Sequence, residues 1–163
     1  MSLRVGVVGL GLMGGSVAEH LVDEGFDVYG YDLSPDARDA AAAVGVTVEE
    51  NGAAVAQQVD VVLTSLPNPQ IVREAYLGAA GGPEDAAAGT LTALVGGPDD
   101  VVESPPVSIV VDAISNASFH VGDVGAGHTS KLLNNVMSMG NLMLAMEAVA
   151  VGAERGLDGA RLL

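Results

Sequence analysis

The chain has 163 residues, of which 49% are apolar and only 3% aromatic, and its formal net charge is −15. This length fits one domain of ordinary size, or one domain with part of another, built on an aliphatic core. A surface with 21 acidic and 6 basic residues repels nucleic acid and anionic membranes, and the absence of cysteine excludes disulfides and thiolate metal sites.

The first elements follow the order of a dinucleotide-binding fingerprint. A short apolar strand over 4–8 runs directly into Gly9-Leu10-Gly11-Leu12-Met13-Gly14, an apolar-periodic helix follows, and a strand over 27–31 ends at Asp32. In this pattern Gly9 permits the tight turn, Gly11 lets the backbone approach a pyrophosphate, and Gly14 lets the helix pack against the strand. The N–H groups of the helix N-terminus attract phosphates. The segment therefore predicts a bound dinucleotide.

Asp32 bears on the choice of cofactor. Its carboxylate is placed to accept hydrogen bonds from a ribose 2′-hydroxyl, and it would repel a 2′-phosphate. Arg38, in the next helix, is the only base close to it in the sequence. We therefore expect NAD to be preferred, with NADP possible.

Strands and helices then alternate up to residue 69. Ser34 and Pro35 begin a helix that ends near Ala43, and a strand over 46–48, a helix over 51–57 and a strand over 60–66 follow. This alternation predicts an α/β fold with a Rossmann-like, doubly wound, mostly parallel sheet. Ligands of such sheets bind at the carboxyl ends of the strands. The fingerprint, Asp32 and Leu66-Pro67-Asn68 are expected to meet there.

The second half reads less regularly. We expect a helix over 70–77, a Gly/Ala loop over 78–89, a strand over 90–95, a helix opened by Ser104 and Pro105, a strand over 118–121 and a flexible corner over 122–127. A long helix over 129–155 follows, and 157–163 could begin another. The predicted domains are residues 1–127, which bind the dinucleotide, and residues 128–163, a long interdomain helix with the start of a truncated helical domain.

Lys131 is the only lysine of the chain, and it lies in the first turn of this long helix. The helix dipole disfavours a cation at that position. Asn135 shares its face because the two residues are four positions apart, and Asn134 lies beside them. A surface lysine covering an apolar face is the ordinary reading of one such residue. With a dinucleotide fingerprint upstream and two amides adjacent, we favour a lysine that exchanges protons in a reaction.

Four motifs taken together resemble the β-hydroxyacid dehydrogenases, a family that includes 3-hydroxyisobutyrate dehydrogenase, tartronate semialdehyde reductase and 6-phosphogluconate dehydrogenase. The motifs are Gly9-Leu-Gly-Leu-Met-Gly14 with Gly15, Leu66-Pro-Asn68-Pro, Gly89-Thr-Leu-Thr with Val95-Gly-Gly97, and Gly125-x-Gly-x-x-x-Lys131-x-x-Asn-Asn135. The resemblance covers nearly the whole chain. It implies reversible oxidation of a small 3-hydroxy acid by NAD or NADP.

The resemblance also implies roles for single residues. The lysine that matches Lys131 acts as general base in oxidation and as general acid in reduction. The asparagine that matches Asn135 holds the substrate, with Asn134 beside it, and Leu66-Pro67-Asn68 borders the cofactor. Gly9, Leu10, Gly11, Leu12, Met13, Gly14 and Asp32 match the cofactor-binding positions.

This chain departs from the family pattern in two places. A strand–helix–strand stretch is absent after Leu77, and Ala80 stands where the family has a serine that binds the substrate carboxylate. Anchoring of the carboxylate would then fall to the N–H groups of Gly81 and Gly82. The family also has a full helical domain after the long helix. A cofactor-binding module that has lost catalysis is therefore the alternative function, and an assembly role of the long helix is a third.

The remaining expectations concern metals, membranes and partners. His20 is predicted on the exposed side of the first helix, and neither His120 nor His128 has a partner at metal-ligand spacing, so no metal is expected. The apolar stretch 132–146 carries three asparagines and is too short and polar to span a bilayer. We expect a cytoplasmic protein that binds no nucleic acid and no membrane, from a salt-rich cytoplasm, forming homo-oligomers through the methionine-rich helix.

Overall fold

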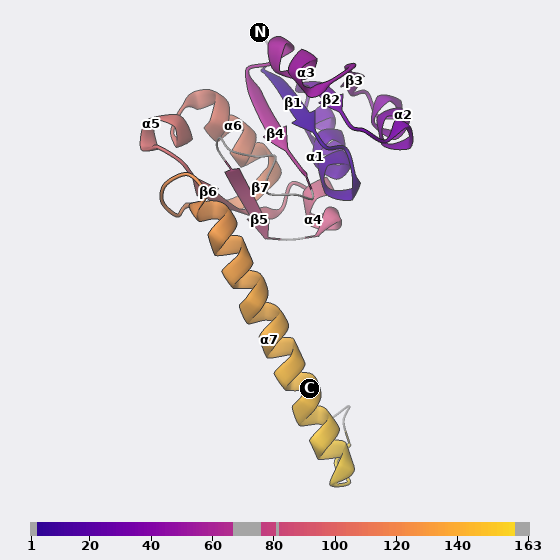
Figure 1. The fold of residues 1–163 in the computed structure, drawn as a ribbon, viewed down its shortest axis with the longest axis vertical. Helices are drawn as coiled ribbons and strands as arrows, with labels where there is room; N and C mark the ends of the chain where they lie inside the picture. Colours follow the sequence, from indigo (N-terminus) through magenta and orange to yellow (C-terminus); the bar gives the residue numbers. More distant parts are fainter. Residues whose placement is uncertain (1–2, 67–75, 81, 159–163) are drawn as a thin grey trace.

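The N-terminal half forms a four-stranded parallel sheet, as the alternating pattern predicts. The computed structural model describes residues 3–66, 76–80 and 82–158. The strands lie in the order β3-β2-β1-β4, and all neighbours are parallel (Figure 1). The elements are β1 (Arg4–Val8), α1 (Leu12–Asp23), β2 (Asp27–Tyr31), α2 (Pro35–Ala43), β3 (Thr47–Val48), α3 (Gly52–Gln58) and β4 (Val61–Thr64).

Aliphatic side chains build the core between this sheet and its helices. Val5 and Val7 of β1 and Leu21 of α1 are fully buried. Two polar side chains begin the flanking helices: the Ser34 hydroxyl accepts a hydrogen bond from the Ala37 N–H (3.4 Å), and the Asn51 side chain accepts one from the Ala54 N–H (2.9 Å). The predicted starts of α2 and α3 are thereby confirmed.

Arg4 and Asp60 fasten the start of β1 to the residue before β4. The Arg4 N–H donates to Asp60 Oδ2 (3.0 Å), and the guanidinium lies 3.5 Å from Oδ1. The backbone hydrogen bond from Arg4, with its side-chain hydrogen bond and charge, lowers the pKa of Asp60 below its usual value, although desolvation opposes this shift.

This pair gives a pH-dependent prediction for Asp60→Asn. Because folding lowers the pKa of Asp60, the stabilisation is present above the unfolded-state pKa and disappears as the pH falls through the folded-state pKa. The variant should therefore unfold slightly more easily than the wild type at neutral pH, and the difference should disappear as the pH falls through the folded-state pKa of Asp60. Urea unfolding of both proteins over a series of acidic pH values measures this. A difference that persists unchanged in acid would remove the carboxylate charge as its cause.

The second half forms a separate three-stranded sheet in the order β5-β6-β7. Its strand β5 is antiparallel to β6, and β7 is parallel to β6. The elements are β5 (Tyr76–Ala80), α4 (Pro83–Ala87), β6 (Leu91–Gly96), α5 (Asp99–Val102), α6 (Pro105–Ile114) and β7 (Ser115–His120). The predicted strand over 90–95 and the helix opened by Ser104 are confirmed.

Two predictions for this half are wrong. Residues 76–80 form strand β5, although the sequence favoured a helix as far as residue 77 and a loop beyond it. The predicted loop over 78–89 also contains helix α4. Strand β7 begins at Ser115, three residues before the predicted start at Ser118. Residues 70–75 of the predicted helix lie outside the described residues.

Helix α1 joins the two sheets, because it contacts α4 and α6 as well as β1 and β2. His20 of α1 donates from Nε2 to the carbonyl oxygen of Ala113 in α6 (2.9 Å) and is partly buried. The expectation of an exposed His20 is therefore wrong. An apolar cavity of about 200 Å³ also separates the sheets, lined by β4 on one side and by the end of β6 and α6 on the other.

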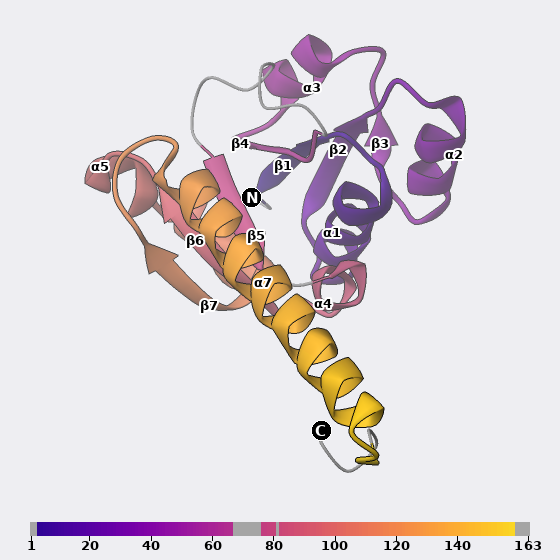
Figure 2. The same cartoon turned by 60° about the horizontal axis from the view of Figure 1, so that its bottom comes forward.

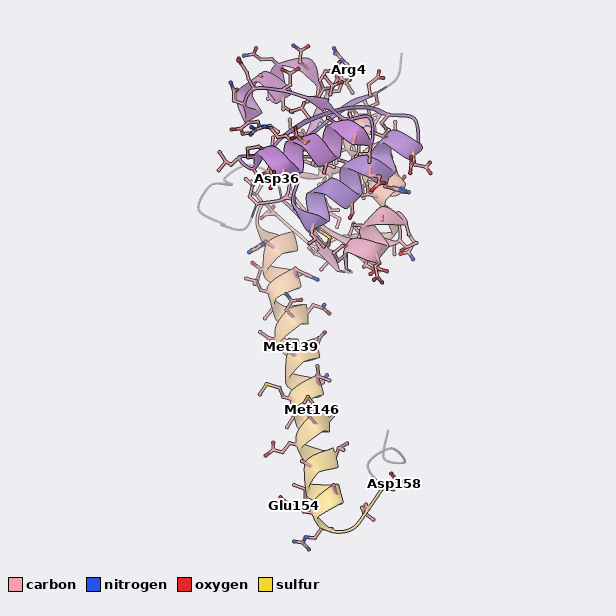
Figure 3. The ribbon with its side chains drawn as sticks, turned by 90° about the vertical axis from the view of Figure 1, so that its right-hand side faces the viewer. Arg4, Asp36, Met139, Met146, Glu154 and Asp158 are labelled. Atoms are coloured by element: carbon pink, nitrogen blue, oxygen red, sulfur yellow. The ribbon has the colours of Figure 1, made fainter. Side chains whose placement is uncertain are left out.

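Helix α7 (Ala126–Glu154) is 29 residues long and extends away from the body of the molecule (Figures 1 and 2). Its first turns contact β5 and β6. Met139, Met146 and Glu154 lie on the projecting part (Figure 3), and nearly all its apolar side chains are exposed. By length and composition α7 could cross a membrane, so the prediction that this segment is too short and polar does not hold.

Candidate functional site

The turn between β1 and α1 requires glycine at its first position. Gly9 has φ +95°, in the left-handed region, and its N–H donates to the Tyr31 carbonyl oxygen (2.8 Å). A Cβ on Gly9 would lie 2.2 Å from the Ser65 carbonyl oxygen. The turn therefore joins the carboxyl ends of β1, β2 and β4.

Gly14 and Gly11 face different surroundings. A Cβ on Gly14 would lie 1.9 Å from the Gly9 carbonyl oxygen and 2.9 Å from the Ser65 Cβ, so α1 packs directly on the turn. Apart from its neighbours along the chain, a Cβ on Gly11 would have no atom of the described residues within 4 Å. The open space over Gly11 is where the backbone of such a turn meets a pyrophosphate, so these residues fit a dinucleotide.

Asp32 closes the other side of the turn. Its Oδ2 accepts a hydrogen bond from the Leu10 N–H (2.7 Å), and its Oδ1 accepts one from the Ser34 N–H (2.8 Å). Each carboxylate oxygen keeps acceptor capacity for a ribose hydroxyl. Arg38 lies beside it, because its Nη1 donates to the Asp32 carbonyl oxygen (2.6 Å) and its guanidinium stands 5.9 Å from the centre of the Tyr31 ring.

These groups surround a pocket of about 540 Å³. Its lining comprises Val8, Gly9, Gly11, Leu12, Met13, Tyr31, Asp32, Leu33, Ser65 and Leu66. The structure thus brings together six of the residues predicted to bind the cofactor. The other four, Val8, Tyr31, Leu33 and Ser65, were not predicted from the sequence. These residues lie at or next to predicted strand ends, which meet at one edge of a parallel sheet, so the sequence did contain an indication of their position.

The other predicted cofactor residues do not line this pocket. Leu10 has its side chain in the core, with 4% of it exposed, and its N–H is engaged by Asp32. Gly14 packs behind the turn and borders the cavity between the sheets. Pro67 and Asn68 lie outside the described residues.

Lys131 lies near the start of α7, six residues after the left-handed Gly125 (φ +92°) that precedes the helix. Because α7 already begins at Ala126, Lys131 is in its second turn, and the expectation that it lies in the first turn is wrong. Lys131 and Asn134 are half-buried, whereas Asn135 is exposed. Within residues 3–66, 76–80 and 82–158, none of these three side chains forms a hydrogen bond or ion pair. The amine and the amides are therefore free to meet a ligand.

The described residues contain no group of three or more His, Asp or Glu side chains that could hold a metal ion. His120 contacts one carboxylate, that of Asp99, with 3.3 Å between Nδ1 and Oδ1.

The sequence model for the NAD-binding domain of 6-phosphogluconate dehydrogenase matches residues 4–81. These residues are therefore similar to the NAD-binding domain of that family. The match spans the turn, Asp32 and the strand ends around the pocket, and the predicted dinucleotide cofactor is thereby confirmed.

Whole-chain relatives confirm the predicted resemblance to β-hydroxyacid dehydrogenases. The 2-(hydroxymethyl)glutarate dehydrogenase of Eubacterium barkeri is 31% identical over 199 residues, covering 96% of this chain and 65% of the relative. The mitochondrial 3-hydroxyisobutyrate dehydrogenase of Drosophila melanogaster is 29% identical, covering 95% of this chain and 60% of the relative. The structure of Mycobacterium tuberculosis 3-hydroxyisobutyrate dehydrogenase with L-serine superposes with a TM-score of 0.89 at 25% identity, covering 97% of this chain and 67% of that one.

The chain spans just under two thirds of the length of the first two relatives. The alignment with the Eubacterium enzyme is 199 residues long, whereas this chain has 163, so the relative contains residues with no counterpart here. That they fall after Leu77 stays a prediction.

The predicted carboxylate anchor is altered in this NAD-binding protein. The Gly82 N–H donates to Asp85 Oδ2 (2.7 Å) in a capping arrangement at the start of α4. This N–H is therefore already satisfied, and a carboxylate beside it disfavours a second one. Gly81 lies outside the described residues. As the structure stands, Gly82 does not offer the free donor that the sequence suggested.

Proposed function

We propose that the protein is an NAD-dependent oxidoreductase that acts on a small 3-hydroxy acid, with Lys131 as its general acid and base. The observation that carries the proposal is the pocket around the Gly9–Gly14 turn and Asp32, in a chain whose relatives are named as dehydrogenases of such acids. When bound, the nicotinamide supplies a hydride acceptor at C4.

The residues of the chain handle the rest of the reaction. In the oxidation direction, Lys131 Nζ takes the proton of the substrate hydroxyl, and in reduction it returns that proton. Asn134 and Asn135 hydrogen-bond the substrate, and Asn135 lies one helical turn beyond Lys131 on the same face. Leu66, Pro67 and Asn68 border the cofactor.

A steady-state assay tests this activity. The purified chain is assayed in high salt with NAD and each of 3-hydroxyisobutyrate, 2-(hydroxymethyl)glutarate, L-serine, glycerate and 6-phosphogluconate. We expect NADH formation with one of the small 3-hydroxy acids. Binding of NADH, seen as a change in nicotinamide fluorescence, without turnover of any substrate would contradict the enzymatic assignment.

That second outcome would favour the alternative, a cofactor-binding module without catalysis. The observation behind it is the substrate side of the site: Ala80 supplies no hydroxyl, and the Gly82 N–H is engaged by Asp85.

We further propose that NAD is preferred over NADP because of Asp32. A 2′-phosphate beside this carboxylate would be repelled. The variant Asp32→Asn removes the charge and keeps one oxygen acceptor for the turn. We expect its ratio of NADPH to NADH affinity to rise about tenfold, which corresponds to about 1.4 kcal/mol. Fluorescence titrations measure both affinities. A wild type that binds NADPH at least about tenfold tighter than NADH would overturn the assignment.

We also propose that two copies of the chain associate through α7, in the cytoplasm and without nucleic acid. One face of α7 carries exposed apolar residues at alternating intervals of three and four, which is the spacing of a coiled-coil seam. They are Leu132, Val136, Met139, Met143 and Met146, and each is more than half exposed.

Sedimentation tests this association with a matched pair of variants. Met143→Glu places a charge in the seam and should convert dimers to monomers, whereas Leu142→Glu, on the same helix outside the seam, should not. Equal sedimentation of both variants as dimers, or of the wild type as a monomer, would contradict the proposed seam. Flotation of the wild type with lipid vesicles would instead indicate a membrane as the partner of α7.

A further inference from the structure

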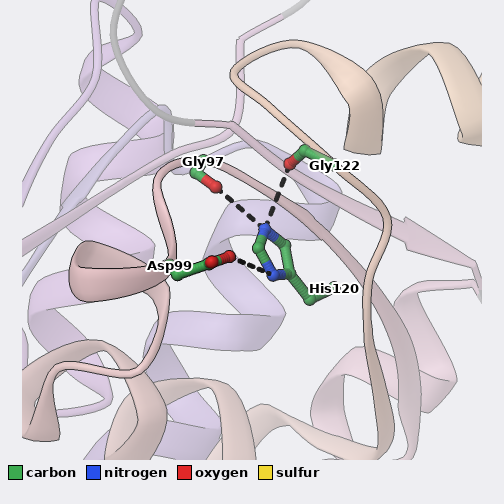
Figure 4. A network of polar contacts seen from close by, with 4 residues as sticks. All are labelled: Gly97, Asp99, His120 and Gly122. Carbon is green, nitrogen blue, oxygen red and sulfur yellow. Dashed lines mark hydrogen bonds and ion pairs between the residues drawn. The ribbon is translucent and has the colours of Figure 1, made fainter.

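His120, the last residue of β7, joins two turns that meet at the start of α7. Its Nε2 lies 2.8 Å from the Gly97 carbonyl oxygen and 3.1 Å from the Gly122 carbonyl oxygen (Figure 4). Both partners are acceptors, so Nε2 carries the proton and donates to both. Gly97 follows β6, and Gly122 begins the turn that leads into α7. One imidazole therefore ties the end of a strand to the base of the helix.

The backbone around His120 is packed tightly at this junction. The Gly97 N–H donates to the Gly122 carbonyl oxygen (2.9 Å), and the Val121 N–H donates to the Val95 carbonyl oxygen (2.8 Å). A Cβ on Gly96 would lie 2.7 Å from the Asp123 carbonyl oxygen and 2.8 Å from the Gly127 nitrogen. The first turn of α7 thus rests directly on the end of β6.

Little else holds α7 in place. Among the described elements, α7 makes extensive contact only with β5 and β6, and the remainder of the helix is exposed. Lys131 is nine residues beyond Gly122 and five beyond Ala126, the first residue of α7. Its position therefore depends on how the start of α7 is held against β5 and β6, and the turn at Gly122 is one of these attachments.

We propose that His120 is a positioning residue for Lys131: its Nε2–H, shared between the Gly97 and Gly122 carbonyls, sets the angle at which α7 leaves the sheet and so places the amine beside the cofactor. This proposal rests on the proposed function, because it assumes that Lys131 acts there. Asp99, at the start of α5, is the charged group that faces the other ring nitrogen, at 3.3 Å. Its carboxylate lies beside Nδ1, on the side of the ring opposite the Nε2 donor (Figure 4).

The single lysine makes the proposal measurable. In protein labelled with ¹³C at the lysine ε-carbon only, the spectrum contains one side-chain resonance, that of Lys131. Three variants are compared with the wild type. His120→Leu removes the donor, His120→Gln restores an N–H donor on a side chain of similar reach, and Asp99→Asn leaves the Nε2 donor in place. Circular dichroism and thermal unfolding establish that each variant is folded.

Without cofactor, we expect His120→Leu to shift the Lys131 resonance and the backbone amides of Ala126 and Gly127, and His120→Gln and Asp99→Asn to leave them near wild type. On addition of NADH, the Lys131 resonance should shift in the wild type, in His120→Gln and in Asp99→Asn, and the shift should be lost in His120→Leu. NADH affinity should stay within about twofold throughout, because His120 does not line the pocket around the fingerprint turn.

The outcomes separate the two proposals. If the wild-type Lys131 resonance does not respond to NADH, the proposed function fails, and the role of His120 in the reaction fails with it. If it responds in the wild type and equally in His120→Leu, only the positioning role is overturned. That role is also overturned if His120→Leu leaves the apo resonances unchanged, or if His120→Gln behaves like His120→Leu.

Discussion

Replacing Gly14 by alanine is expected to destabilise the protein by about 3 kcal/mol or more, which is the upper range for overpacking a filled site. The added methyl group would lie 1.9 Å from the Gly9 carbonyl oxygen and 2.9 Å from the Ser65 Cβ, and the first of these neighbours is backbone. Helix α1 would have to move away from the turn, and α1 also joins the two sheets. Urea unfolding followed by circular dichroism measures the loss.

Two other glycines serve as controls for this variant. Gly11→Ala adds a methyl group that meets no atom of the described residues within 4 Å beyond its chain neighbours. The variant should therefore keep the fold and weaken NADH binding at least about tenfold by occupying the pyrophosphate position. Gly140→Ala, in the open part of α7, should be neutral or stabilising by up to about 1 kcal/mol. A Gly14→Ala protein as stable as the wild type, or a Gly11→Ala protein that binds NADH normally, would contradict this division of roles.

Lys131→Ala is expected to lower kcat by about 10²- to 10⁴-fold, the usual contribution of a general acid or base. The affinity for NADH should change little, because Lys131 lies on α7 and the pocket is formed by the four-stranded sheet. The measurement is a steady-state assay with the best 3-hydroxy acid, together with a fluorescence titration of NADH.

Lys131→Arg separates proton transfer from simple attraction of charge. An arginine keeps the positive charge but stays protonated at neutral pH, so it cannot act as a base. We expect this variant to be nearly as slow as Lys131→Ala. Activity retained by the alanine variant would remove Lys131 from the mechanism. Activity restored by arginine would assign it an electrostatic role instead.

The nucleotide-binding half was predictable because its signals are local. The run from Arg4 to Asp32 contains a strand, a glycine turn, a helix and a second strand in uninterrupted order, and the caps Ser34 and Asn51 precede their helices directly. Each of these features depends on neighbours in the sequence. The predicted bounds therefore lie within a few residues of those in the structure.

The second half was harder because its order depends on contacts between distant residues. Residues 76–80 are rich in glycine and alanine and have little strand preference of their own, yet all five pair with residues 92–96 of β6. His20 looked exposed from helical spacing alone, but α6 packs over it through Ala113. Such pairings leave no periodic pattern in the sequence.

The site was predicted in part for the same reason. Gly9, Gly11 and Asp32 follow from the fingerprint, whereas Ser65 and Tyr31 enter the pocket only because three strands end together. The engagement of Gly82 did have a local signal. Asp85, at the third position of helix α4, is where an acidic side chain reaches back to the preceding N–H, so the capping arrangement could have been predicted.

Because α7 is attached at one end only, a rotation at its start produces a much larger displacement at its far end. At 1.5 Å per residue its 29 residues extend about 43 Å from the junction at Gly122, so a rotation of about 5° there moves the far end by about 4 Å. The same rotation shifts Lys131, close to the fulcrum, by less than about 1 Å. A partner that displaces the distal end of α7 would therefore change the position of the Lys131 amine by only a fraction of that displacement.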